Sequence, residues 1–137
     1  PNLVEAGVFV LKRQRSIPER LEQLHLDLSA LADEHSPDYV AVEKLYAHYR
    51  HPRTSILMAH ARGVILLCAQ QRGIPVQDLP ATEVKKAVTG YGHASKEQIQ
   101  LAVQSQCRLP RPPAPADVAD AIAIALTHAR RIVTARL

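Results

Sequence analysis

The amino-acid sequence predicts an α/β layer fold in which short strands alternate with longer helices. Residues 39–42 form a continuous apolar run, which is typical of a strand buried on both faces. Residues 74–79 have strand character as well, and long stretches of helical character cover 18–34, 54–72 and 116–136. This alternation favours parallel strand pairs, because parallel neighbours need a long crossover connection between them.

The N-terminal segments are predicted from their apolar pattern. Residues 3–11 are rich in valine and predict a first strand. Pro18 suits the first turn of a helix, and leucines at 3-4-3 spacing then predict an amphipathic helix to about Glu34. These leucines are Leu21, Leu24, Leu28 and Leu31.

The later helices are predicted from the extent of their apolar surface, from their capping residues and from the turns that bound them. The segment 54–72 is apolar around much of its circumference, which indicates burial on two sides, against the sheet and against a partner subunit. Residues 82–88 predict a short helix. Ser95 and Gln98 form a capping-box pattern that opens the next one, and a proline-rich stretch precedes the final helix.

The composition is that of a single folded domain. The chain has 137 residues, of which 47% are hydrophobic. No apolar run approaches the roughly 18 residues that a membrane-spanning helix needs. Its two isolated cysteines are typical of buried thiols in a reducing compartment, so we expect a cytoplasmic protein. The formal net charge of +4 permits a polyanionic partner without requiring one.

The strongest chemical signal is the pair Asp117 and Asp120 at the start of the apolar final helix. Side chains three residues apart share a helix face, and two carboxylates this close are unfavourable unless a cation lies between them. A hard divalent cation with oxygen ligands is the simplest candidate. In the alternative interpretation, Asp117 interacts with the positive helix N-terminus and Asp120 faces water.

Glu43 directly follows the predicted strand 39–42. In open α/β sheets, functional groups gather beyond the carboxyl ends of the strands, although Glu43 can also be a surface carboxylate at a strand end. If it converges with Asp117 and Asp120, the three acids form a cation site. The absence of cysteine or a nearby liganding histidine favours Mg²⁺ or Mn²⁺ over Zn²⁺.

Four blocks of the sequence, in order, resemble the RuvC family of Holliday-junction resolvases. They are P-D-Y-V-A-V-E-K-L-Y (37–46), A-R-G-V (61–64), V-K-K-A-V-T-G-Y-G-H-A-S-K (84–96) and A-D-V-A-D-A-I-A-I-A-L-T-H (116–128). The resemblance implies an RNase H-like mixed sheet flanked by helices. It also implies a homodimer that cuts four-way DNA junctions in recombination and repair, and works with the RuvA and RuvB branch-migration proteins.

The resemblance also implies roles for individual residues. Glu43, Asp117 and Asp120 match three of the family's four metal-binding acids. They are therefore expected to hold two Mg²⁺ ions, with Mn²⁺ as an alternative, for in-line attack of water on a phosphodiester. Lys85 and Lys96 match lysines that face DNA.

Two further DNA contacts are expected near Glu43. Tyr46 matches an aromatic residue near the junction centre and is expected to stack on a base, the alternative being an ordinary core aromatic. Arg50 lies in a basic loop, which either follows the phosphate backbone or is simply a solvated surface.

The sequence departs from the family at its start. The family opens with a strand carrying a Gly-Ile-Asp-Pro-Gly-like motif, whose aspartate completes the metal site, and this motif is absent from the 137 residues. We therefore expect residues 1–137 to form one N-terminally incomplete nuclease domain that lacks the first strands and is impaired in cleavage. The alternatives are a catalytically inactive junction-binding fragment and another RNase H-like nuclease.

Overall fold

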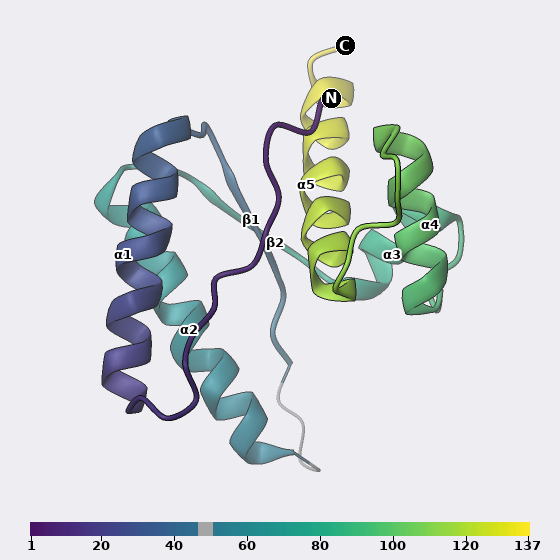
Figure 1. Cartoon of the computed structure of the whole chain (residues 1–137). Coiled ribbons are helices and arrows are strands. Elements are labelled where there is room, and N and C mark those ends of the chain that lie inside the picture. Colours follow the sequence, from purple (N-terminus) through teal and green to yellow (C-terminus); the bar gives the residue numbers. More distant parts are fainter. Residues whose placement is uncertain (47–50) are drawn as a thin grey trace. The chain divides into compact units, whose positions relative to one another are not determined.

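The computed structural model describes residues 1–46 and 51–137. The elements follow one another as α1 (Ile17–His35), β1 (Val40–Glu43), α2 (Pro52–Gln71), β2 (Val76–Leu79), α3 (Ala81–Thr89), α4 (Lys96–Cys107) and α5 (Ala116–Ala135) (Figure 1). They group into two compact units: the first contains Pro1–Val8, Ala41–Lys44 and Asp78–Leu137, and the second contains Phe9–Val40 and Leu45–Gln77. The predicted α/β class is confirmed.

The strands β1 and β2 pair with each other in a two-stranded sheet. The Val40 N–H donates to the carbonyl of Pro75 and the Lys44 N–H donates to that of Leu79, each at 2.9 Å. Donor and acceptor advance by the same number of residues in the same direction, so the strands are parallel. Their carboxyl ends therefore lie at the same edge of the sheet, where Glu43 is the last residue of β1.

Two predictions about strands are wrong. Residues 3–11 run without regular secondary structure, and Val4 and Val10 are 81% and 79% exposed. A strand needs a neighbour for its backbone groups, and among the described residues only β1 and β2 pair. The run at 39–42 is not buried on both faces either: residues 40–42 are half-buried and Tyr39 is exposed, because each strand of a two-stranded sheet is an edge strand.

The core of the first unit lies among α3, α4 and α5 (Figure 1). Helix α5 contributes a face of small and branched side chains, and Ile99 and Val103 of α4 are almost completely buried. Burial of one such side chain contributes about 1.5–3 kcal/mol. The predicted capping box of α4 is confirmed, because Ser95 Oγ accepts from the Gln98 N–H at 3.1 Å. The α5 core residues are Val118, Ala119, Ile122, Ala123 and Leu126.

In the second unit, α1 packs side by side with α2 (Figure 1). The α1 side contributes the buried Leu24, and the α2 side contributes the buried Cys68 and Ala69. Other large apolar side chains of α2 are exposed, so within residues 1–46 and 51–137 this helix is not buried on two sides, and its burial against a partner stays a prediction. These side chains are Ile56, Leu57, Met58, Leu66 and Leu67.

No helix within residues 1–46 and 51–137 has the length and apolar character needed to cross a lipid bilayer.

Candidate active site

A pocket of about 310 Å³ lies in the first unit. Its charged lining residues come from four different elements: Glu43 from β1, Lys85 from α3, Lys96 from α4 and Asp120 from α5. Residues that are distant in the sequence therefore meet in one cavity. The remaining walls are largely apolar and include Val84, Ile99 and Ile124.

The local structure fixes the backbone positions of three of the four charged groups. Glu43 is held at the end of β1, because the next residue, Lys44, donates its N–H to Leu79 of β2. Lys96 is the first residue of α4 and directly follows the capping residue Ser95. Asp120 is in the second turn of α5, next to the fully buried Ala119. The folding of the first unit therefore orients all three groups.

The pKa of the Asp120 carboxyl is shifted by its surroundings in the pocket. Partial burial raises the pKa of its carboxyl, and the negative charge of Asp117 raises it further. The positive charges of Lys85 and Lys96 act in the opposite direction and lower this pKa. A half-buried carboxylate beside a second carboxylate is a group that a bound cation stabilises in its ionised form.

The two aspartates differ in their surroundings. Asp117 is exposed in the first turn of α5 and does not line the pocket, whereas Asp120 is half-buried and lines it. The alternative in which Asp120 merely faces water is therefore wrong. Of the three acids predicted for a cation site, the structure brings Glu43 and Asp120 into one cavity and leaves Asp117 within electrostatic reach of Asp120.

The other predicted site residues are less closely gathered. Tyr46 belongs to the second unit and is 54% exposed, so it is not a core aromatic. Arg50 lies outside the described residues. Lys85 and Lys96, by contrast, both line the pocket.

Ser95 is the uncharged polar residue of the pocket, and the sequence did not identify it as part of a site. It was recognised only as a helix cap, through its spacing from Gln98. That signal was informative in retrospect, because a residue that caps a helix also fixes the position of the next residue, here Lys96.

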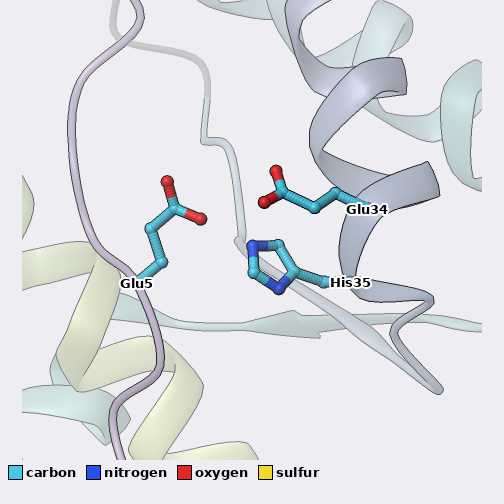
Figure 2. A group of neighbouring side chains, drawn as sticks. All are labelled: Glu5, Glu34 and His35. Carbon is cyan, nitrogen blue, oxygen red and sulfur yellow. The ribbon is translucent and has the colours of Figure 1, made fainter.

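Metal-ligating residue types also occur outside the pocket. Glu34 and His35 are the last two residues of α1, and Glu5 lies in the N-terminal segment (Figure 2). All three are exposed, and Glu5 belongs to the first unit while the other two belong to the second. We assign no site to them.

The parallel strand pair, the helices that alternate with its strands along the chain and a pocket that combines two carboxylates with two lysines define an α/β protein with a mixed acidic and basic site. Comparison with known proteins is more specific. Residues 2–128 match the family model described as crossover junction endodeoxyribonuclease RuvC, and the chain belongs to this family.

Individual relatives agree with this assignment. The chain is 52% identical over 124 residues to the crossover junction endodeoxyribonuclease RuvC of Rhodopirellula baltica, covering 90% of the chain and 70% of the relative. It is 45% identical over 122 residues to that of Syntrophomonas wolfei, covering 89% and 70%.

Two solved structures have the same fold. A Thermus thermophilus RuvC structure matches with a TM-score of 0.86 and 33% identity, over 98% of this chain and 80% of that one. The structure of T. thermophilus RuvC in complex with Holliday junction substrate also matches with a TM-score of 0.86, at 34% identity, over 93% and 77%. The predicted RNase H-like fold class and the predicted family are confirmed.

Proposed function

We propose that this chain is a structure-selective endonuclease that resolves four-way (Holliday) DNA junctions in recombination and repair. Membership of the crossover junction endodeoxyribonuclease family supports the activity, and the similarity to a RuvC that was solved with Holliday junction substrate supports the choice of DNA. The observation that carries the proposal is the convergence of Glu43, Lys85, Lys96 and Asp120 in one pocket.

The acidic residues are suited to hold divalent cations. Glu43 and Asp120 offer carboxylate oxygens in one cavity, which is the ligand type that Mg²⁺ prefers. Asp117 increases the negative potential at Asp120 and can ligate from the exposed side of the helix. We assign these three residues to a site for two Mg²⁺ ions, or Mn²⁺ in their place. Such ions activate water and neutralise charge on the reacting phosphate.

The two lysines are suited to bind the phosphodiester. An ammonium group is a compact positive charge that binds phosphate, and Lys85 and Lys96 line the same cavity as the carboxylates. A phosphate bound by them lies beside the acidic groups, so the chain orients the bond to be cut. The apolar walls limit the access of bulk water and strengthen these charge interactions.

Further contacts and partners belong to the same proposal. Tyr46, exposed just beyond β1, is assigned to base stacking, and Arg50 to the phosphate backbone. The exposed apolar residues of α2 are assigned to a homodimer, which would present two pockets to two opposed strands. RuvA and RuvB are proposed as partners in a cytoplasmic complex.

Junction cleavage assays test the proposal. The chain is incubated with an end-labelled four-way junction, a linear duplex of the same sequence and an RNA–DNA hybrid, each with and without Mg²⁺. The expected result is Mg²⁺-dependent nicking of the junction alone, and its loss in Glu43→Gln. Equal cleavage of the hybrid would instead support another RNase H-like nuclease.

The second candidate function is junction binding without cleavage. Of the three predicted acids, Glu43 and Asp120 line the pocket whereas Asp117 is exposed outside it, and this favours the second candidate. In that case the chain binds the junction in Ca²⁺ and does not nick it when Mg²⁺ is added. Mg²⁺-dependent nicking would contradict this candidate.

A further inference from the structure

The turn between α3 and α4 holds the backbone of Tyr91 in a fixed position. Gly90, just before it, has a φ of 84°, a left-handed conformation that glycine adopts without steric cost. The hydroxyl Oγ1 of Thr89 accepts from the Tyr91 N–H at 3.1 Å. The Ala94 N–H donates to the Tyr91 carbonyl at 3.2 Å. Both polar groups of the Tyr91 backbone are therefore bonded within the turn.

Thr89 also connects this turn to the pocket. Its hydroxyl lies 2.7 Å from the carbonyl oxygen of Lys85 and 3.1 Å from that of Tyr91, and either can accept its single proton. Lys85 lines the pocket, and so do Ala94, Ser95 and Lys96, which immediately follow the turn. The basic wall of the pocket and the turn that carries Tyr91 are thus one connected piece of backbone.

The Tyr91 ring itself is turned to solvent. It is 58% exposed, and its one aromatic neighbour among the described residues is His93, which meets it in an edge-to-face arrangement with a centroid separation of 5.8 Å and an interplanar angle of 73°. An edge contact leaves ring surface uncovered. A large flat side chain on a fixed backbone offers stacking area at little entropic cost, because few of its torsions remain to be ordered.

From this geometry we propose that Tyr91 is a stacking platform for one nucleobase of the bound DNA, beside the phosphate-binding pocket. The proposal rests on the proposed function, since it needs a strand of DNA whose phosphate lies between Lys85 and Lys96. The base of that strand is displaced from its neighbours where a junction opens. Stacking on an aromatic ring replaces part of the lost base stacking and tolerates any base.

The test measures junction affinity in Ca²⁺ for Tyr91→Leu, Tyr91→Phe and Leu101→Ala. Tyr91→Leu removes the ring, Tyr91→Phe keeps it, and Leu101 is a matched control because it is also 58% exposed in the first unit. Loss of the ring is expected to weaken binding about 5- to 150-fold. Tyr91→Phe and Leu101→Ala should bind as the unsubstituted chain does. Circular dichroism verifies that each variant folds.

A second series identifies the base. Single nucleotides around the crossover are replaced one at a time by abasic nucleotides, and each DNA is titrated with the unsubstituted chain and with Tyr91→Leu. On the DNA that lacks the stacked base, Tyr91→Leu should bind no more than about twofold more weakly than the unsubstituted chain. The ring and the base contribute through one shared contact, so removing the ring has little further effect once the base is gone. The proposal is overturned if Tyr91→Leu weakens binding by the same factor on every abasic DNA. It is also overturned if Tyr91→Leu does not weaken binding to the intact junction.

The two proposals fail separately. If the unsubstituted chain binds the junction no better than a linear duplex, the proposed function is contradicted. The comparison of abasic DNAs still decides the stacking inference in that case, because it is made between molecules that differ by one base.

Discussion

The side-chain amide Nε2 of Gln100, on α4, donates a hydrogen bond to the carbonyl oxygen of Pro113 at 2.9 Å. This hydrogen bond ties the proline-rich segment to α4 just before α5 begins. The N-cap residue of α5, Pro115, provides no side-chain hydrogen bond to the helix. The position of the first turn of α5, which carries Asp117, therefore depends on a contact made from a neighbouring helix.

Gln100→Leu should loosen the start of α5. We expect a loss of about 1 kcal/mol in the free energy of unfolding, since one hydrogen bond to a half-buried carbonyl is removed. Amide hydrogen exchange should accelerate at residues 114–118, and the Mg²⁺ concentration needed for half-maximal cleavage should rise. The measurements are denaturant unfolding, exchange by mass spectrometry and a metal titration.

The matched control is Gln106→Leu. It removes a similar hydrogen bond, which Gln106 Nε2 donates to the carbonyl oxygen of Val88 at 2.8 Å. It should lose comparable stability without changing the metal requirement. If both variants change the metal requirement equally, Gln100 acts through general stability rather than through the position of Asp117.

Asp120→Asn should stabilise the chain near neutral pH when no divalent cation is present. Burial and the charge of Asp117 raise the pKa of Asp120 in the folded state, so its ionised form opposes folding. The folded state is then most favoured below the unfolded pKa of about 3.9. That advantage is lost as the pH rises through the higher folded pKa. Thermal melts from pH 3 to pH 8 should show Asp120→Asn gaining over the unsubstituted chain only as the pH rises.

Adding Mg²⁺ should reverse this ranking, because a ligand that binds only the folded state stabilises it. The unsubstituted chain should gain more thermal stability from Mg²⁺ than Asp120→Asn does. Asp38→Asn, at an exposed position in the second unit, is the control and should respond as the unsubstituted chain does. An equal response of all three chains would remove Asp120 from the metal site.

The salt dependence of junction binding should report the pocket lysines. Each phosphate contact contributes about −0.9 to the slope of log affinity against log salt. Lys85→Ala and Lys96→Ala should each bind more weakly and reduce the magnitude of this slope by about one unit. Lys12→Ala, exposed and in the second unit, should leave the slope unchanged. Fluorescence anisotropy over a range of KCl concentrations provides the measurement.

Asp33 on α1 and Arg72, just after α2, form an ion pair within the second unit, with Arg72 Nε 2.8 Å from Asp33 Oδ1. The hydrogen bond from Arg72 lowers the pKa of Asp33. Its contribution to stability is therefore present above the unfolded pKa of about 3.9 and disappears as the pH falls through the lower folded value. Asp33→Asn should be less stable than the unsubstituted chain at pH 7 and equal to it near pH 2, as measured by urea unfolding.

Leu57→Glu and Leu67→Glu should keep the chain monomeric, if the exposed apolar residues of α2 form the dimer interface. A charge buried in an interface without a partner is strongly unfavourable. Leu101→Glu, on α4, provides a control with similar exposure outside that face. Analytical ultracentrifugation measures the oligomeric state. A dimer that survives both α2 substitutions would place the interface elsewhere.

The sequence predicted the elements that local rules determine. The cap at Ser95 is formed as its spacing from Gln98 indicated, because a capping box needs only residues three apart. The place of Glu43 at the end of β1 also followed from a local apolar run. The strand predicted at 3–11 did not form, since strand pairing depends on a neighbour that no local pattern identifies.

The sequence predicted which acidic residues belong to the site, but not which of them line the pocket. Asp117 and Asp120 were recognised together from their spacing, yet their different exposure depends on how α5 packs against α3 and α4. The same packing makes Ser95 part of the pocket. Spacing along one helix determines which side chains share a face, whereas tertiary contacts determine which of them is enclosed.

The sheet of two parallel strands has a consequence for handling the protein. Among the described residues, each strand pairs with one other strand, and sheet edges of this kind are where extended segments add by β-augmentation. The same chemistry would make concentrated solutions prone to self-templated assembly.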